Sequence, residues 1–233
     1  GPQIDSWIAI DGGKIGRVNN KGLGSYRYRV TFKGPGGHSW GAFGLANPHH
    51  ALGKAISHFV AAADVYTAEG PKTSYNVGVI SGGTSINSIP FESIMEIDIR
   101  SIDPSRLDTM ETLLEEALNK ALTHQNGIKR QGPNLTVSID KIGNRPSGEL
   151  SDSLPLIQRV LAATSHFGAK PYLTRGSTDS NIPIAKGIPA VTIGRGGKGG
   201  KAHSLDEWWL NDEGYKAIQL AMLIVLSDSQ LVK

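Results

Sequence analysis

The sequence has 233 residues, which is enough for one large domain or two small ones. Its 39% hydrophobic and 19% charged residues are ordinary for a globular protein, and a net charge of +3 is too small to indicate nucleic-acid binding. No apolar run approaches the roughly 20 residues of a membrane helix, and no signal peptide is visible. Because there is no cysteine, any metal site must use His, Asp or Glu.

Two short strands are expected at the start of the chain, Ile4–Ile10 and Lys14–Val18. Between them lies the sequence Asp11-Gly12-Gly13, which predicts either a hairpin turn or the end of a strand. An Asp before two glycines is most often a turn residue, so Asp11 has no special role on this pattern alone.

The middle of the chain, over about 26–142, alternates between strand and helix patterns. Two helices have clear start signals, Asn47-Pro48 and Asp103-Pro104, and Gly127 is expected to end the second. The expected strands alternate apolar and polar residues and cover Tyr26–Lys33, Tyr75–Ile80, Ser93–Arg100 and Leu135–Ile142. The order β-α-β-β-α-β predicts a ferredoxin-like domain, a four-stranded antiparallel sheet backed by two helices.

The last part of the chain predicts a different arrangement. A helix at about 153–167, strands near 171–174 and at Ala190–Ile193, and a helix from about Asn211 favour a parallel sheet with helices on both faces. We therefore interpret residues 23–145 as a ferredoxin-like domain inserted into an α/β domain formed by 1–22 and 146–233. Too few strands are visible for that outer domain, so its first half is expected to be missing.

Four segments occur in an order that matches a known family. They are IAIDGG (8–13), GPGGHSWGAFGLANP (34–48), SINSIPFESIMEIDIRS (85–101) and GSTDSNIPIAKGIPAVTIGRGGKGGKAHSLDEW (176–208). Together they resemble the M20 family of metallopeptidases, which includes tripeptide aminopeptidases, carboxypeptidases, dipeptidases and acyl-amino-acid deacylases. The resemblance implies an α/β zinc-peptidase domain with an inserted lid domain that forms a homodimer.

The resemblance also implies two metal ligands in this chain. Asp11 would bind one of two divalent metals, usually zinc, and His203 would bind the other. Carboxylate oxygen and imidazole nitrogen both suit Zn²⁺. The family's upstream His-x-Asp and its Glu-Glu pair, which includes the general base, have no counterpart before Asp11. We therefore expect this chain alone to be inactive and its metal site to be incomplete.

Further residues receive roles from the resemblance. His38 would donate a hydrogen bond to the developing oxyanion in the partner subunit, and Asn87 and Arg100 would hold a carboxylate or carbonyl of the substrate. On the local sequence pattern alone, Arg100 is expected to be a surface charge and Asn87 a turn residue. Ser177 and Thr178 lie in GSTDSN, a segment that fits either an anion-binding loop or a helix cap in which Ser177 or Asp179 is the cap.

Two other functions fit parts of the sequence. Ser39 in GHSWG fits the G-x-S-x-G pattern of serine hydrolases, with Asp179 and His203 following, but no helix is expected directly after it. The second is a non-catalytic dimerisation or binding module. RNA-recognition domains share the ferredoxin-like topology, but the expected sheet lacks their aromatic pattern.

The sequence thus predicts part of a zinc hydrolase that acts on small peptides or N-acyl amino acids, with no nucleic-acid or membrane partner. A cytoplasmic location is expected, and secretion stays open.

Overall fold

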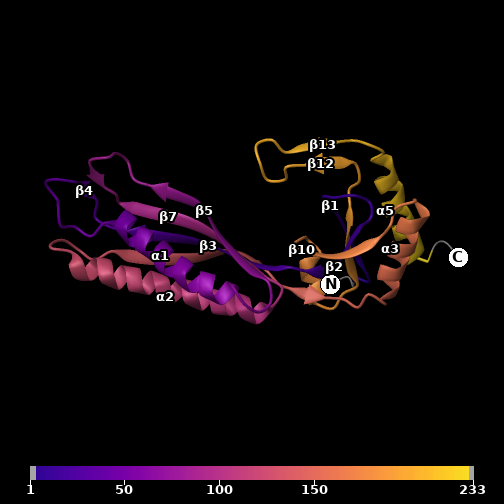
Figure 1. Ribbon diagram of the computed structural model, residues 1–233, viewed down its shortest axis with the longest axis horizontal. Coiled ribbons are helices and arrows are strands. Elements are labelled where there is room, and N and C mark those ends of the chain that lie inside the picture. The colour runs from indigo at the N-terminus through magenta and orange to yellow at the C-terminus, as the bar shows by residue number, and fades with distance from the viewer. Residues whose placement is uncertain (1–3, 231–233) are drawn as a thin grey trace. The chain divides into compact units, whose positions relative to one another are not determined.

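The computed structural model describes residues 4–230 of the chain (Figure 1). It divides into two compact units, each with its own hydrophobic core. The central unit is residues 24–144, and the flanking unit is formed by residues 1–23 and 145–233.

The central unit is built on a four-stranded sheet with the strand order β5-β7-β3-β8. Strand β7 pairs antiparallel with both β3 and β5. Its main elements are β3 (Gly24–Lys33), α1 (Pro48–Thr67), β5 (Thr73–Gly82), β7 (Glu92–Ser101), α2 (Pro104–Ile128) and β8 (Thr136–Arg145). This is the predicted β-α-β-β-α-β order, so the fold class is confirmed.

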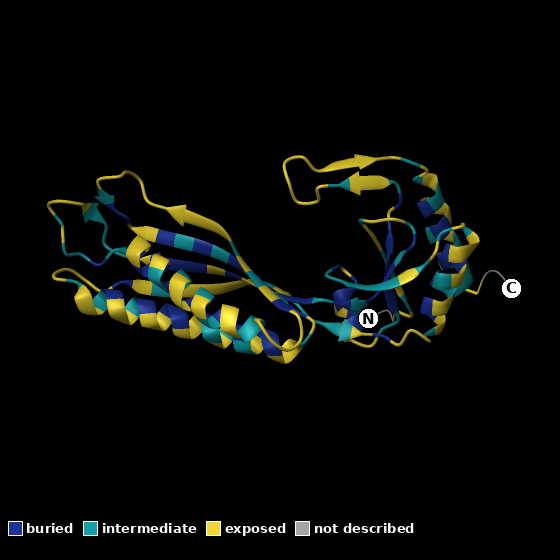
Figure 2. Cartoon of the chain, viewed as in Figure 1, coloured by how far each residue is buried: buried dark blue, intermediate teal, exposed yellow. Residues whose placement is uncertain are grey.

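Alternation along the strands creates the core of the central unit. On β7, Met95, Ile97 and Ile99 are buried, whereas Glu96 and Asp98 between them stay partly exposed, and Figure 2 shows this banding. The apolar stripes of α1 and α2 cover the buried face, with Phe59 and Met110 fully buried. The opposite face of the sheet therefore carries charged side chains and has no helix on it.

The helix start signals are confirmed. Asn47 caps α1 by accepting hydrogen bonds from the backbone N–H of His49 and His50, and Asp103 caps α2 by accepting one from Ser105. The predicted stop at Gly127 is wrong, because α2 continues to Ile128. Gly127 does not adopt a positive φ, and without one it does not break the helix.

The flanking unit has a sheet with the strand order β1-β11-β2-β10, and β9 pairs with β2. Its main elements are β1 (Trp7–Asp11), β2 (Arg17–Gly22), β9 (Gly148–Glu149), α3 (Pro155–His166), β10 (Tyr172–Gly176), α4 (Asn181–Ala185), β11 (Ala190–Gly194) and α5 (Tyr215–Asp228). The sheet is mixed: β1 is parallel to β11 and β10 to β2, but β11 is antiparallel to β2.

The prediction of a purely parallel sheet is therefore wrong. Strands β1 and β2 are joined by a short loop with no crossover helix, and such a loop connects strands that run in opposite directions. They do not form a hairpin either, because β11 lies between them. Asp11 consequently marks the end of a strand, which was the other predicted possibility.

The two faces of the flanking sheet differ in chemistry. Val18, Val191 and Ile193 point to one face and pack with the apolar sides of α3 and α5. The alternate residues Asn19 and Thr192 point to the other face, where they are also buried. On that face the hydroxyl of Thr192 is 2.7 Å from those of both Thr178 and Ser180. A hydrogen-bonded polar layer thus underlies the segment that leads into α4.

Several short elements were not predicted. They are β4 (Gly37–His38) with β6 (Ser88–Ile89), which form a two-stranded sheet, β9, and the hairpin of β12 (Lys198–Gly200) and β13 (Trp208–Leu210). Two or three residues are too few to show a periodicity. Among residues 4–230, no helix is both long and apolar enough to cross a membrane.

Candidate functional site

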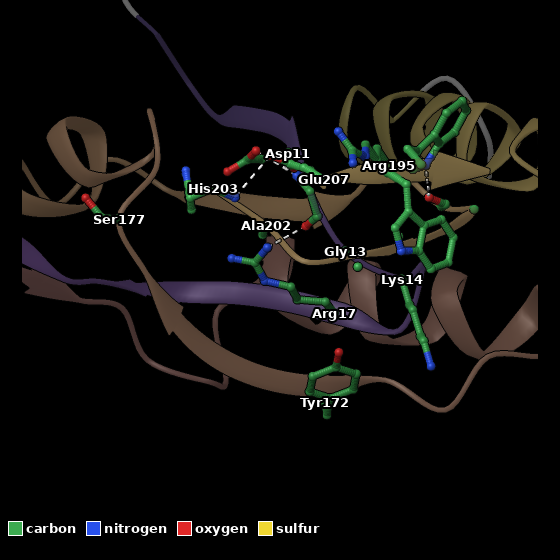
Figure 3. Close-up of a pocket in the computed structure, with 17 residues that line it drawn as sticks. Asp11, Gly13, Lys14, Arg17, Tyr172, Ser177, Arg195, Ala202, His203 and Glu207 are labelled. Atoms are coloured by element: carbon green, nitrogen blue, oxygen red, sulfur yellow. Dashed lines mark hydrogen bonds between the residues drawn. The ribbon is translucent and has the colours of Figure 1, made fainter. Parts of the chain in front are cut away.

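A pocket of about 680 Å³ lies within the flanking unit, between the end of β1 and the β12–β13 hairpin (Figure 3). Acidic, basic, aromatic and hydroxyl side chains all line it. They are Asp11, Lys14, Arg17, Tyr172, Ser177, Arg195, His203, Glu207, Trp208 and Trp209. The two predicted metal ligands, Asp11 and His203, therefore reach the same pocket although they come from opposite ends of the chain.

Asp11 owes its position to strand pairing. It is the last residue of β1 and lies opposite Gly194 of β11 in the parallel register. A Cβ at Gly194 would meet the backbone oxygen of Lys14 at 2.1 Å, so only glycine lets the following loop approach so closely. The Oδ1 atom of Asp11 accepts a hydrogen bond of 2.6 Å from the backbone N–H of Gly12, and the side chain is exposed to the pocket.

His203 lies in the turn between β12 and β13, in an unusual backbone conformation. Its φ is +65°, in the left-handed region that residues other than glycine rarely adopt. The backbone N–H of His203 donates to Oε2 of Glu207 at 3.1 Å, which ties the turn together. A strained residue held by its surroundings is typical of functional sites, so this geometry directs attention to His203.

The donor set fits a metal ion only in part. Carboxylate oxygen and imidazole nitrogen are the ligand types that zinc accepts. Within residues 4–230, however, no group of three or more His, Asp and Glu side chains is placed to hold a metal ion. Asp11 and His203 can therefore supply part of a coordination shell, and the predicted zinc site stays a prediction.

Several pocket residues were missed by the sequence analysis. Arg17, Arg195 and Lys14 make the lining of the pocket strongly basic, and none of them forms an ion pair with another residue of the described chain. Trp209 is anchored to the hairpin, since its Nε1–H donates to the carbonyl of Gly196 at 3.2 Å and the Arg195 guanidinium lies 5.6 Å from its ring. In the sequence, the two adjacent tryptophans Trp208 and Trp209, which directly follow the segment HSLDE that begins at His203, could have indicated that this segment contributes to the pocket.

Ser177 and Thr178 separate in the structure. Ser177 lines the pocket, but Thr178 is only 5% exposed and its hydroxyl is used by Thr192. The helix cap predicted at Ser177 or Asp179 is wrong, because α4 begins later, with Ser180 at its N-cap and no side-chain cap. The hydroxyls of this segment bond to the sheet beneath it instead.

In the central unit, His38 and Asn87 lie close together. His38 pairs with Ser88 in the β4–β6 sheet, and the backbone N–H of Ser39 donates to the carbonyl of Asn87 at 2.8 Å. Nδ1 of His38 accepts from the backbone N–H of Trp40 and Gly41 at 3.2 and 3.3 Å. A neutral imidazole with Nδ1 accepting carries its proton on Nε2, which leaves an exposed donor.

Arg100 lies elsewhere in the central unit, near the far end of β7. Its Nε donates to Oδ2 of Asp98 at 2.6 Å, on the sheet face that no helix covers. Partial burial pushes the pKa of Asp98 upward, but hydrogen bonds from Arg27 and Arg100 outweigh it and hold that pKa below its ordinary value. The structure therefore brings Asn87 to His38 but not Arg100 to either within this chain.

The serine-hydrolase alternative lacks its structural context. Ser39 follows a two-residue strand and leads into a turn, and the next helix begins only at Pro48. A nucleophile elbow needs a strand before the serine and a helix directly after it. Asp179, its expected partner, is paired with Arg145 at 3.6 Å in the flanking unit.

Comparison with known proteins finds a matching domain and a shared fold. Residues 19–126 match the M20 peptidase dimerisation domain. Two similar solved structures are a tripeptidase from Staphylococcus aureus (20% identity, TM-score 0.70, 96% of this chain and 57% of that chain) and the aminopeptidase PepT from Bacillus cereus (19% identity, TM-score 0.66, 95% and 56%). The chain therefore carries an M20 dimerisation domain and has the fold of M20 peptidases and related amidohydrolases.

A curated relative adds a second kind of hydrolase. Ureidoglycolate hydrolase from Arabidopsis thaliana is 31% identical over 156 residues, which are 65% of this chain and 31% of the relative. The chain thus spans about a third of the length of this relative, and 57% and 56% of the two solved structures. The predicted M20 resemblance is confirmed, and the activity of the whole protein is a matter for proposal.

Proposed function

We propose that this chain is part of a metal-dependent hydrolase that cleaves a peptide or amide bond in small peptides or N-acyl amino acids. The observation that carries the proposal is the meeting of Asp11 and His203 in one pocket. Their positions in the sequence are 192 residues apart, as 203 − 11 = 192, and no local pattern requires them to meet.

The pocket residues have separable roles in this proposal. Asp11 would hold one of two divalent metals such as zinc and His203 the other; such metals, when bound, polarise a carbonyl and acidify water. Lys14, Arg17 and Arg195 would attract an anionic group of the substrate into the pocket. Trp208 would limit the access of water, because its ring lines the same pocket.

His38 is proposed as the hydrogen-bond donor for the substrate carbonyl, in the pocket of a partner subunit. Its exposed Nε2–H supports this role, since both backbone contacts are made by Nδ1. A preorganised donor of this kind stabilises a developing oxyanion by about 3–4 kcal/mol. The dimerisation-domain match supports a homodimer as the assembly in which it acts.

The substrate class is supported by the relatives' names, which fall into two groups. The solved structures include a tripeptidase and an aminopeptidase, and the curated relative is a ureidoglycolate hydrolase. The latter favours a second candidate, a non-peptide amide substrate with a ureido group. Both candidates share an amide-type carbonyl next to a carboxylate, so they predict the same pocket residues.

Zinc titration of the purified chain tests the proposal. We expect weak zinc binding that falls at least about tenfold in Asp11→Asn and in His203→Gln, because each change removes the donor that this chain supplies to one of the two metals. The matched controls are Asp206→Asn, whose carboxylate pairs with Lys201 at 2.9 Å in the same turn, and His166→Gln at the end of α3. Both controls should bind zinc as the unchanged chain does.

Hydrolysis assays complete the test. A tripeptide, an N-acetylated amino acid and ureidoglycolate would be supplied to the chain with zinc, and to a longer parent protein where one exists. Zinc binding that is equal in all four variants would overturn the proposed site. Turnover that persists in Asp11→Asn and His203→Gln without zinc would overturn the metal-dependent mechanism.

A further inference from the structure

The loop that follows β1 is held through three successive carbonyl groups. The carbonyls of Asp11 and Gly13 accept backbone N–H groups from the chain that follows β11, at 2.9 and 3.1 Å. The carbonyl of Gly12, which lies between them, accepts instead from a side chain, through Nη1 of Arg17 (Figure 3). The outer two bonds continue the pairing of β1 with β11, so the middle bond is the one that depends on a particular side chain.

This middle bond matters because the loop contains two glycines. Gly13 has a φ of +111°, a region that glycine enters freely, and neither glycine has a side chain that packs against the unit. Gly12 also donates its backbone N–H to Oδ1 of Asp11, at 2.6 Å. A bond that limits rotation at Gly12 therefore also limits where the Asp11 carboxylate lies.

Arg17 lies in a space that two glycines leave for it. A Cβ on Gly13 would come within 3.0 Å of Cδ of Arg17, and a Cβ on Gly176 would come within 3.0 Å of its Nη2. Gly13 belongs to the loop after β1, and Gly176 ends β10 directly before Ser177. From its position at the start of β2, Arg17 thus reaches both of the chain segments that bring Asp11 and Ser177 to the pocket.

A buried amide supports the guanidinium group of Arg17. Oδ1 of Asn19 accepts from Nε of Arg17 at 3.3 Å and from the hydroxyl of Thr174. Asn19 is 1% exposed, and its Nδ2 has no hydrogen-bond partner within residues 4–230. Turning the amide over would set a donor against Arg17, so the unpaired nitrogen follows from directing Oδ1 at the guanidinium group. A buried amide kept with one unpaired atom indicates a role for its paired atom.

The three basic residues of the pocket therefore differ from one another. Lys14 and Arg195 line the pocket as Arg17 does. Among the described residues, however, the side chains of Lys14 and Arg195 form no hydrogen bond with the loop after β1, whereas Arg17 does. Positive charge is thus common to all three, and the hold on Gly12 is specific to Arg17.

We propose that Arg17 is a positioning residue for Asp11. It holds the Gly12 carbonyl and so keeps the Asp11 carboxylate directed into the pocket, with Asn19 as its buried support. The inference rests on the proposed function for the role of Asp11 as a metal ligand, and it gives Arg17 a second task besides attracting an anionic group. In this task Arg17 contacts neither metal nor substrate, because it acts through Gly12.

Zinc titration by calorimetry separates positioning from charge, because the two predict opposite signs. Removing a positive charge beside a cation site strengthens cation binding by simple electrostatics. Removing the bond to Gly12 instead lets Asp11 turn away, so we expect Arg17→Gln to weaken zinc binding about fivefold. Lys14→Gln removes the same charge from the same pocket and should leave zinc binding equal or slightly tighter. Arg17→Lys, which keeps a donor and the charge, should recover part of the loss.

A double variant shows whether Arg17 acts through Asp11. When Asp11→Asn has already removed the carboxylate, adding Arg17→Gln should weaken zinc binding no further. Losses that add in the double variant would show that Arg17 affects zinc by another route, and they would overturn the inference.

The Gly12 amide gives a second readout that needs no metal. In the zinc-free chain, solvent exchange of the Gly12 N–H, followed by NMR, should become about tenfold faster in Arg17→Gln, because its bond to Asp11 is formed less often. The rate should stay within about twofold in Lys14→Gln. Amides of β11 should exchange at an unchanged rate in both variants, which distinguishes a local effect from a general loss of stability.

The outcomes separate this inference from the proposed function. An unchanged Gly12 exchange rate in Arg17→Gln, or equal effects of Arg17→Gln and Lys14→Gln on zinc binding, would overturn the inference and leave metal-dependent hydrolysis untouched. Faster Gly12 exchange in a chain whose zinc binding does not depend on Asp11 would support the hold of Arg17 on the loop and contradict the proposed function.

Discussion

The two units of this chain bury their cores in different ways. The central unit is one continuous stretch of sequence, and its sheet is covered on one face by α1 and α2. The flanking unit joins segments from both ends of the chain, and its sheet mixes parallel and antiparallel pairs. The outer side of α5 leaves Ile218 and Met222 more than 60% exposed, at 72% and 64%. The central unit also leaves an apolar side chain of a helix exposed, since Val65 of α1 is 77% exposed, so the two units differ in how their cores are assembled and not in how completely they are enclosed.

The difference also separates two kinds of functional residue. In the central unit, His38 and Arg100 lie on strands and are held by hydrogen bonds with near neighbours: His38 accepts from the backbone N–H of Trp40, and Arg100 donates to Asp98. In the flanking unit, Asp11 and His203 meet only because distant strands pair and a glycine-rich hairpin returns to the sheet. Figure 2 shows the β12–β13 hairpin as exposed along most of its length. The pocket of the flanking unit thus depends on less tightly packed structure.

The largest expected effect tests whether the two cores are independent. Phe59→Ala in the central unit should lower the free energy of unfolding by about 3–5 kcal/mol, because Phe59 is fully buried and packs edge-on against Tyr75. Ile157→Ala in the flanking unit should cost about 2–5 kcal/mol for the same reason. Urea unfolding followed by circular dichroism would record both transitions.

Tryptophan fluorescence assigns those transitions. Three of the four tryptophans, Trp7, Trp208 and Trp209, are in the flanking unit. Ile157→Ala should therefore shift the fluorescence midpoint more than Phe59→Ala does. If both variants move one common transition equally, the units unfold together and the comparison between them fails.

A smaller effect concerns the polar layer of the flanking sheet. Thr192→Val keeps the shape of the side chain but removes the hydroxyl that contacts Thr178 and Ser180. Buried hydroxyls left without a partner cost about 1–3 kcal/mol, so the free energy of unfolding should fall by that amount. Thr112→Val, at an exposed position of α2, is the control and should change it by less than about 0.5 kcal/mol. Equal losses in the two variants would show that the layer contributes nothing of its own.

Sequence patterns predicted the central unit better than the flanking one, for physical reasons. The alternation of apolar and polar residues along β7 and the apolar stripe of α1 are local patterns, and the structure buries the residues that they predict. The order of β1, β11 and β2 depends on pairing between distant segments, and no local pattern records it. Arg17 and Arg195 lie next to turns, and no local pattern predicts that they line the pocket.

A helix cap gives a still smaller effect in the central unit. Oδ1 of Asn47 accepts from the backbone N–H of His49 at 2.9 Å, and Asn47→Ala would leave this donor without its partner. We expect a loss of about 1 kcal/mol in the free energy of unfolding. Asn47→Asp should be close to neutral, because a carboxylate accepts the same hydrogen bond. A loss in the aspartate variant as large as that in Asn47→Ala would mean that the cap is not the cause.

The smallest expected effect is the pH dependence that Asp98 gives to the central unit. Partial burial opposes the charged form, but Arg27 and Arg100 hold the pKa of Asp98 below its ordinary value in the folded chain. The unfolded chain therefore takes up a proton first as the pH falls. The stabilisation is fully present above the unfolded pKa and is lost as the pH drops through the folded pKa.

Asp98→Asn isolates this contribution, because it removes the titration and keeps an oxygen that can accept one hydrogen bond. The difference in free energy of unfolding between the two proteins should be constant near neutral pH and shrink as the pH falls from about 5 to about 2. Glu96→Gln, on the same face, is the control for the general loss of carboxylate charge. If the difference does not change with pH, the two arginines do not stabilise the Asp98 carboxylate.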